Sequence, residues 1–132
     1  MNSEYIHELT PQALNEIPFH SDVKWIERLV ANNLPFHLAV HKITAAEEMP
    51  LEYVETHVHV SPELNIILGN NDTFQFKVNL GSEVYHVKSP STIWIPAGMN
   101  HSVMAISGSG YYICLILKED KNVTYESLTR KS

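Results

Sequence analysis

The chain has 132 residues, one cysteine and a formal net charge of −6 with its histidines neutral. This length suits a single domain, 1–132, with one core, and one cysteine cannot form an intrachain disulfide. Basic residues form no cluster, so we expect no nucleic-acid partner. No apolar run is long enough to span a bilayer, so we expect no membrane partner. The N-terminus lacks the apolar segment of a signal peptide, so we expect a cytoplasmic protein.

Residues 1–35 predict an N-terminal arm. Thr10 followed by Pro11 is typical of a helix cap with proline at the first helical position, which predicts a short helix from there to Glu16. Residues 22–32 place apolar side chains on one helical face, but the same side chains suit a β-strand. We leave helix and strand open for this segment.

Residues 36–117 have the character of an all-β domain. Phe74, Phe76, Val78 and Leu80 alternate with polar residues, which is the period of a half-buried strand. Glycine-rich or proline-containing turns separate the strands, among them 69–72 and 107–110. Residues 118–132 predict a polar tail with room for a short closing strand. The expected strands are 36–44, 53–60, 64–68, 74–80, 84–87, 92–95, 101–106 and 111–117, a pattern typical of a sandwich or barrel.

Two histidines and a glutamate form the first candidate site. His57 and His59 flank one residue of a predicted strand, so their side chains point to the same face. Glu63 follows after a short bend that can return a carboxylate to the same point. Imidazoles with a carboxylate suit a transition metal better than Ca or Mg. The alternative is that both histidines face solvent.

A second motif lies between two predicted strands, where Pro96, Gly98 and His101 stand at fixed offsets. The order His57-Val58-His59, Glu63, Gly69, then Pro96, Gly98 and His101 resembles the two-part signature of the cupin superfamily. One residue fewer than usual separates Glu63 from Gly69. The resemblance covers the motifs within 51–105, and the strand pattern extends it to about 36–117.

The resemblance implies a cupin-type antiparallel β-barrel (a double-stranded β-helix or jelly roll) with a short N-terminal helical segment. It also implies that His57, His59, Glu63 and His101 bind one divalent metal ion. Pro96 and Gly98 match the turn that directs the last ligand inward. Leu51, Pro90 and Ala105 stand where the family has glycine, glycine and asparagine, positions that shape turns and packing.

Strand parity suggests the walls of a substrate pocket. Tyr53 shares the face of the first two histidines, Asn65 and Ile67 share the face of Glu63, and Val103 shares the face of His101. We take these four as candidate substrate-binding residues, with Asn65 as either a substrate-orienting residue or a buried amide bonded to backbone. We expect Glu55 to be a charge at the barrel mouth, and lone Cys114 to be a buried apolar residue rather than a nucleophile.

The remaining histidines carry weaker signals. His37 and His41 lie four residues apart on one strand face and could line the cavity, although exposed strand positions are favoured. His20 has no partner pattern and is expected on the surface. Trp25 and Trp94 are expected in the core or in a subunit contact.

Three imidazoles and one carboxylate leave two positions of an octahedral ion open, which favours a small anionic or chelating organic substrate. Iron is slightly favoured over Mn, Ni, Co or Zn. The first hypothesis is a non-haem Fe(II) dioxygenase. The alternatives are a redox-neutral metal-dependent isomerase, lyase, hydrolase or cyclase, and a non-catalytic metal- or ligand-binding cupin. Cupins commonly pair through their sheets, so a homodimer is expected.

Overall fold

Antiparallel strands make up most of the computed structural model, which describes residues 2–47, 52–69, 73–117 and 128–131. Every strand pair is antiparallel, as expected for an all-β cupin-type barrel. The elements are η1 (Asn2–Tyr5), β1 (Thr10–Pro11), η2 (Leu14–Glu16), β2 (Ile26–Ala31), β3 (Phe36–Glu47), β4 (His57–His59), β5 (Glu63–Gly69), β6 (Gln75–Leu80), β7 (Glu83–Lys88), β8 (Ser91–Ile95), β9 (His101–Leu117) and β10 (Thr129–Lys131).

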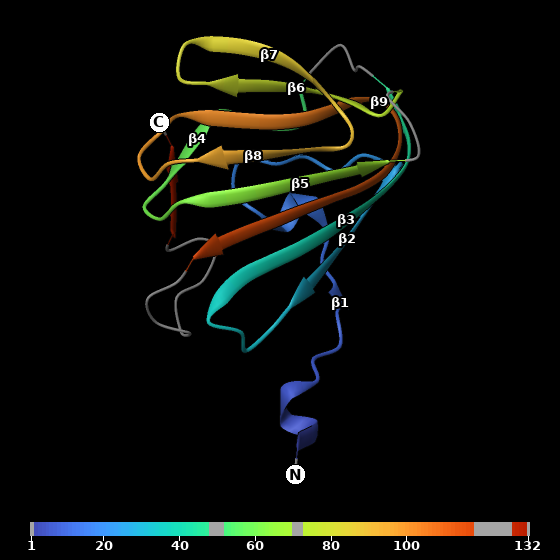
Figure 1. The fold of residues 1–132 in the computed structure, drawn as a ribbon, viewed down its shortest axis with the longest axis vertical. Helices are drawn as coiled ribbons and strands as arrows, with labels where there is room; N and C mark the ends of the chain where they lie inside the picture. The colour runs from blue at the N-terminus through green and yellow to red at the C-terminus, as the bar shows by residue number, and fades with distance from the viewer. Residues whose placement is uncertain (1, 48–51, 70–72, 118–127, 132) are drawn as a thin grey trace.

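The long strand β9 links the two sides of the barrel. Its first part pairs with β6 and touches β4 through one pair, His57 with His101. Its second part lies between β3 and β5. Figure 1 shows β9 running beside β6, bending over and returning between β5 and β3. The outer strands β7, β8 and β10 pair with β6, β5 and β4, so all ten strands belong to one sheet in which β9 connects the two sides of the barrel.

The strand break expected at 107–110 is wrong, because β9 continues through these residues and only bends there. Gly108 and Gly110 have φ angles of 82° and 157°. A Cβ on Gly108 would lie 2.6 Å from the backbone oxygen of Thr73, so only glycine lets the two backbones approach this closely. The glycines therefore permit a bend inside a paired strand rather than ending it.

The predicted helix over 10–16 is also wrong in its first half. Thr10 and Pro11 form β1, which pairs with Val30 and Leu29 of β2, and only Leu14–Glu16 forms a single 3-10 turn. Pairing with a distant strand outweighs the local capping signal, and proline is tolerated because β1 is an edge strand. Of the segment 22–32, for which helix and strand were left open, Ile26–Ala31 forms strand β2, which pairs with β3 along its whole length, and 22–25 precede it without helix or strand.

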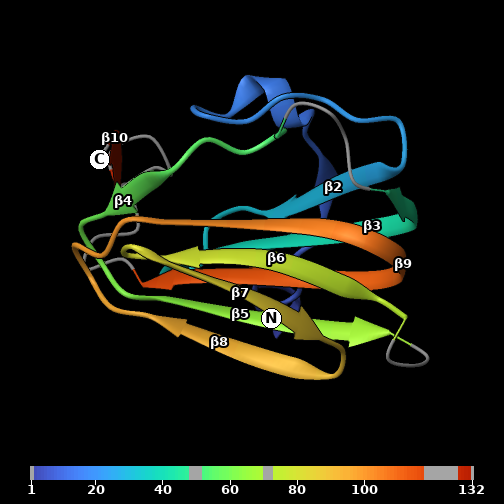
Figure 2. The same cartoon turned by 90° about the horizontal axis from the view of Figure 1, so that it is seen from above.

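The core confirms the alternation predicted for β6. Phe76 and Val78 are fully buried, whereas the adjacent Gln75 and Lys77 are not. They pack with Phe74, Ile67 and Ile95 inside the barrel. Burying each large apolar side chain contributes about 1.5–3 kcal/mol, so this cluster supports the barrel without a metal ion. Figure 2 shows the same strands turned by 90°, with β8 beside β5 and β2 beside β3.

Some sequence expectations fall outside the described residues, including the turn at 70–72 and the tail at 118–127. The expected short closing strand is present as β10, which pairs with β4. Among the residues that the structure describes, no helix has the length and apolar character needed to cross a membrane.

Candidate metal centre

The candidate ligands come from three strands that the fold brings together. His57 and His59 lie on β4, Glu63 begins β5, and His101 begins β9 directly opposite His57. The three histidine rings lie with their centroids 4.5 to 5.0 Å apart. All four side chains are almost completely buried. Residues 44 positions apart in the chain thus share one enclosed site.

The three imidazoles are oriented by hydrogen bonds on the side away from the centre. Nδ1 of His57 donates to the backbone oxygen of Glu55 at 2.7 Å, and Nδ1 of His101 donates to that of Met99 at 3.0 Å. Nδ1 of His59 bonds the hydroxyl of Thr129 on β10 at 2.7 Å. Fixing Nδ1 in this way leaves Nε2 as the coordinating atom, which is how metal-binding histidines are commonly held.

The spacing of the ligand atoms fits a single ion. One nitrogen from each histidine lies within 4.8 Å of the others, so this group could hold a metal. Two ligands bound to one ion at about 2.1 Å can stand at most about 4.2 Å apart. Small side-chain rotations would therefore complete the coordination. The donor set of neutral imidazoles suits Zn, Cu, Fe or Ni.

Glu63 faces the same point through one oxygen. Its Oε1 lies 2.8 Å from Nε2 of His59 and 3.6 Å from Nε2 of His101. Its Oε2 accepts a hydrogen bond of 2.7 Å from Nδ2 of Asn65. Burial opposes ionisation of Glu63, but the hydrogen bonds with His101 and His59 outweigh it and hold the pKa well below its usual value. The carboxylate is therefore ionised and able to bind a cation.

The histidines differ in their affinity for protons. Burial lowers the pKa of His57 to about 3, so this imidazole is neutral and ready to coordinate. Burial also acts to lower the pKa of His101, but the hydrogen bond and charge of Glu63 outweigh it and raise that pKa above 6.5. Protons therefore compete with a metal ion more strongly at His101 than at His57.

The second motif positions the site as the resemblance implied. Gly98 has a φ of 80°, a conformation that other residues rarely adopt, and its N–H donates to the backbone oxygen of His59 at 2.9 Å. The turn that starts at Pro96 thus ties the start of β9 to the strand carrying the first two histidines.

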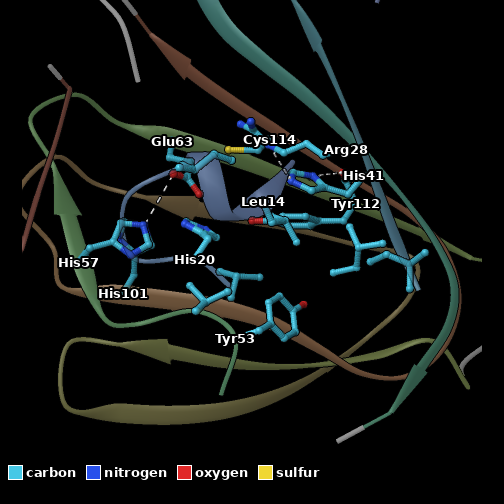
Figure 3. Close-up of a pocket in the computed structure, with 15 residues that line it drawn as sticks. Leu14, His20, Arg28, His41, Tyr53, His57, Glu63, His101, Tyr112 and Cys114 are labelled. Carbon is cyan, nitrogen blue, oxygen red and sulfur yellow. Dashed lines mark hydrogen bonds and ion pairs between the residues drawn. The ribbon is translucent and has the colours of Figure 1, made fainter. Parts of the chain in front are cut away.

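A small cavity opens beside the metal centre (Figure 3). The space inside it that the centre of a water molecule can reach has a volume of about 40 Å³. A water needs about 10–15 Å³ on this measure, so the space admits roughly three. The cavity is lined by Leu14, Ile17, His20, Ile26, Arg28, His41, Ile43, Tyr53, Val54, His57, Glu63, His101, Val103, Tyr112 and Cys114.

The four candidate substrate-binding residues take different places. Tyr53 and Val103 line the cavity. Ile67 does not line it, because the face of β5 continues past the site into the barrel core, where Ile67 is fully buried. Asn65 does not line it either, since its amide lies behind Glu63 and holds that carboxylate. Glu55 is exposed, as expected at the barrel mouth.

Three cavity residues, His20, Arg28 and His41, had a weak signal or none in the sequence. His20, expected on the surface, lies against His57 with ring centroids 5.5 Å apart, because the arm pairs with 53–55 through the bridge from His20 to Val54. His41 and His37, for which exposed positions were favoured, are buried. Arg28 is only 5% exposed and contacts both of them. The spacing of His37 and His41 was the only available clue.

The lone cysteine behaves as expected of a buried thiol. Burial, together with the negative charge of Glu63, raises the pKa of Cys114 well above its usual value. The thiol therefore stays protonated and is a poor nucleophile. Trp94, by contrast, is 57% exposed and is not part of the core. Trp25 packs partly buried against the core.

Comparison with known proteins identifies the architecture. No family model and no curated protein matches the sequence. Solved structures do match. The nucleoside dehydratase Pac13 from Streptomyces is 12% identical, with a TM-score of 0.59 over 96% of this chain and 91% of that chain. The polyketide cyclase RemF from Streptomyces resistomycificus is 14% identical, with a TM-score of 0.58 over 94% and 80%.

An RmlC-like cupin from Shewanella frigidimarina is 12% identical, with a TM-score of 0.53 over 84% of this chain and 92% of that chain. Sequence identities this low show a shared fold but do not show a shared activity, substrate or metal. Together with the antiparallel barrel and the three-histidine group, they establish that this chain has the cupin fold.

Proposed function

We propose that this protein is a metal-dependent enzyme that acts on a small chelating organic acid. The observation that carries the proposal is the set of three imidazoles, each bonded at Nδ1 and facing a buried carboxylate beside a small cavity. A divalent ion bound there would act as a Lewis acid on a substrate oxygen. His57, His59, Glu63 and His101 would hold it.

A redox-neutral reaction has specific support from His20. Its Nδ1 donates to the backbone oxygen of Pro18 at 2.7 Å, so Nε2 is the acceptor nitrogen of the neutral ring. Burial lowers the pKa of His20 to about 4, which keeps the ring neutral. A neutral imidazole on the cavity wall can accept a proton from a substrate carbon next to a polarised carbonyl. The cyclase and dehydratase among the similar structures are in keeping with this class.

A dioxygenase is the second candidate. An iron ion held by His57, His59, Glu63 and His101 would supply the oxygen chemistry of this class. The apolar walls of the cavity, which include Ile26, Ile43 and Val103, would admit oxygen. Iron remains slightly favoured on ligand type.

The test begins with metal analysis of protein purified without chelator or added metal. Small 2-hydroxy and 2-oxo acids are then screened for turnover with and without oxygen. We expect turnover that persists without oxygen, stops on chelation and returns with the metal. Turnover that requires oxygen would instead support the dioxygenase. Binding of metal without any turnover would overturn the enzyme proposal in favour of a binding protein.

The role of His20 is tested with His20→Gln. We expect kcat to fall by about 10²- to 10⁴-fold, the usual contribution of a general base, with unchanged metal content. His86→Gln is the matched control, because His86 lies exposed on β7. An unchanged kcat in His20→Gln would remove His20 from the mechanism.

We also propose a homodimer formed through the outer face of the β8–β5–β9 sheet. Leu68 and Tyr111 are opposite each other on this sheet and are 46% and 47% exposed, and Trp94 on β8 is 57% exposed. Exposed apolar side chains grouped in this way commonly mark a subunit contact. Sedimentation should show a dimer at micromolar concentration, and Trp94→Lys should shift it to a monomer.

A further inference from the structure

His59 differs from the other two histidines of the candidate metal centre in what holds its ring. Nδ1 of His57 and Nδ1 of His101 each donate to a backbone oxygen two residues earlier in the chain, at 2.7 and 3.0 Å. Every residue type supplies such an oxygen. Nδ1 of His59 instead bonds Oγ1 of Thr129 at 2.7 Å, and this side chain lies 70 positions further along the chain. The orientation of His59 therefore depends on one particular side chain near the C-terminus.

Strand β10 places Thr129 beside His59. All three residues of β10 pair with the three residues of β4, and Thr129 stands opposite His59 in this register. Figure 2 shows β10 beside β4. Strand β4 also pairs with β9, but through a single pair, His57 with His101. Among the residues that the structure describes, β10 thus supplies most of the backbone pairing of the strand that carries two candidate ligands.

The residue before β10 anchors this strand in the barrel. Leu128 is 3% exposed, and it belongs to an apolar cluster with Ala39, Cys114 and Ile116. Its backbone oxygen accepts a hydrogen bond of 2.7 Å from the N–H of Val60, the residue that follows β4. An apolar contact and a backbone hydrogen bond therefore hold β10 where the Thr129 hydroxyl reaches the His59 ring.

The Thr129 hydroxyl can do for His59 what the backbone oxygens do for the other two histidines. It can accept a hydrogen bond from Nδ1–H, which leaves the lone pair of the neutral ring on Nε2. Nε2 is the nitrogen that faces the other candidate ligands, since it lies 2.8 Å from Oε1 of Glu63. A hydrogen-bond partner behind a ligating histidine commonly raises metal affinity by about 10- to 100-fold.

We propose that Thr129 is a positioning residue of the metal centre, and that metal binding and the docking of strand β10 stabilise each other. A strand near the end of a chain is among the parts of a protein that open most readily. When β10 separates from β4, His59 loses the Thr129 hydroxyl and the centre loses metal affinity. Because such coupling is reciprocal, bound metal holds β10 in place. This inference rests on the metal binding in the proposed function.

The first test measures metal affinity in variants of Thr129. Thr129→Val keeps the shape and the strand preference but cannot accept a hydrogen bond, so its affinity for Zn(II) should fall by about 10- to 100-fold. Thr129→Ser keeps the hydroxyl and should retain most of the affinity. Thr44→Val is the matched control, because Thr44 is exposed on β3 and its hydroxyl bonds the backbone oxygen of Trp25. Affinity is measured by competition with a chelating dye at pH 7, and circular dichroism checks that each variant is folded.

The second test follows the docking of β10 through the amide hydrogen of Val60, which is bonded to Leu128. Saturating Zn(II) should slow the exchange of this hydrogen by about tenfold or more in the wild type, and by a smaller factor in Thr129→Val. The amide of Ser89 is the control, because it donates to the backbone oxygen of Phe74, before β6, whereas the other end of β6 pairs with His101. Its exchange should slow by a smaller factor than that of Val60.

The outcomes separate this inference from the proposed function. A folded Thr129→Val variant with Zn(II) affinity within about threefold of wild type would overturn the positioning role, and so would an equal loss in Thr129→Ser. If Zn(II) left exchange at Val60 unchanged, or slowed exchange at Ser89 as much, the coupling to β10 would be wrong. Failure of the wild type to bind any divalent metal would overturn the proposed function and this inference with it.

Discussion

Replacing Asn65 with leucine tests whether the residue behind Glu63 controls metal affinity. Asn65 is fully buried on β5, and its Nδ2 donates to Oε2 of Glu63 at 2.7 Å. The other carboxylate oxygen, Oε1, faces His59 and His101. The amide therefore holds the carboxylate with one oxygen directed at the metal position. Leucine has a similar shape but cannot donate.

The expected loss follows from this single charged hydrogen bond. Such a bond contributes about 1.5–3 kcal/mol, and removing a group that orients a ligand typically lowers metal affinity by about 10- to 100-fold. Oδ1 of Asn65 has no hydrogen-bond partner among the residues described, so leucine also removes a buried unsatisfied atom. Leucine also leaves Oε2 of the buried Glu63 carboxylate without this donor, so the metal-free variant should lose up to about the same 1.5–3 kcal/mol of stability, and metal affinity is compared on folded protein.

The assay is competition for Co(II) or Zn(II) with a chelating dye at pH 7, with urea unfolding of the metal-free protein alongside. Asn79→Leu is the control, because Asn79 donates to the Ser102 hydroxyl at 3.0 Å on the opposite sheet face from His101. It should keep wild-type metal affinity. A folded Asn65→Leu variant with affinity within threefold of wild type would refute the positioning role, and equal losses in both variants would point to general loosening of the barrel.

Three further predictions follow from the same structure. His101→Ala should lose the metal but keep the wild-type circular dichroism spectrum, because the core is apolar; unfolding would show that the metal is structural. The metal-free protein should lose stability as pH falls from 6.5 to 4.5, because the unfolded state takes up protons at His41 and His57 while their folded-state pKa values stay at about 3. In urea unfolding, the free energy of unfolding should fall by up to about 1.4 kcal/mol per pH unit for each of these two histidines, and by less in total in His41→Gln. A free energy of unfolding that does not change with pH would contradict this prediction. Gly108→Ala should destabilise the protein by more than Gly81→Ala, since both have a positive φ but only a Cβ on Gly108 meets backbone, and equal losses in urea unfolding would exclude a close contact at the bend.

Residue spacing made part of the site predictable. Side chains at i and i+2 of a strand share a face, so His57 and His59 could be paired from the sequence alone. The alternation of Phe76 and Val78 with polar residues located β6 and its buried face for the same reason. Both features follow from the alternation of side chains along a single strand, so neighbouring residues are enough to predict them. The meeting of both motifs at one point was implied by the cupin resemblance, and the fold brings them together.

Other features depended on partners far away in the chain. The segment around Ile26 suited helix and strand equally, and pairing with β3 decided it. Thr10 and Pro11 carried a capping signal, but pairing with β2 overrode it. Gly108 and Gly110 resembled a break between strands, yet two neighbouring strands keep β9 continuous across them.

The cavity residues show most clearly what the sequence alone determined and what it left to the tertiary structure. Local periodicity determined most of the strands and the shared face of His57 and His59, the first two candidate metal ligands. Arg28 and His41 carried no local pattern that marked them as neighbours, because their contact arises from the register of β2 against β3. His20 reached the candidate metal centre only through pairing of the arm with 53–55. Long-range backbone pairing therefore decided which charges surround the cavity, since hydrogen bonds between distant strands set a register that no local sequence pattern specifies.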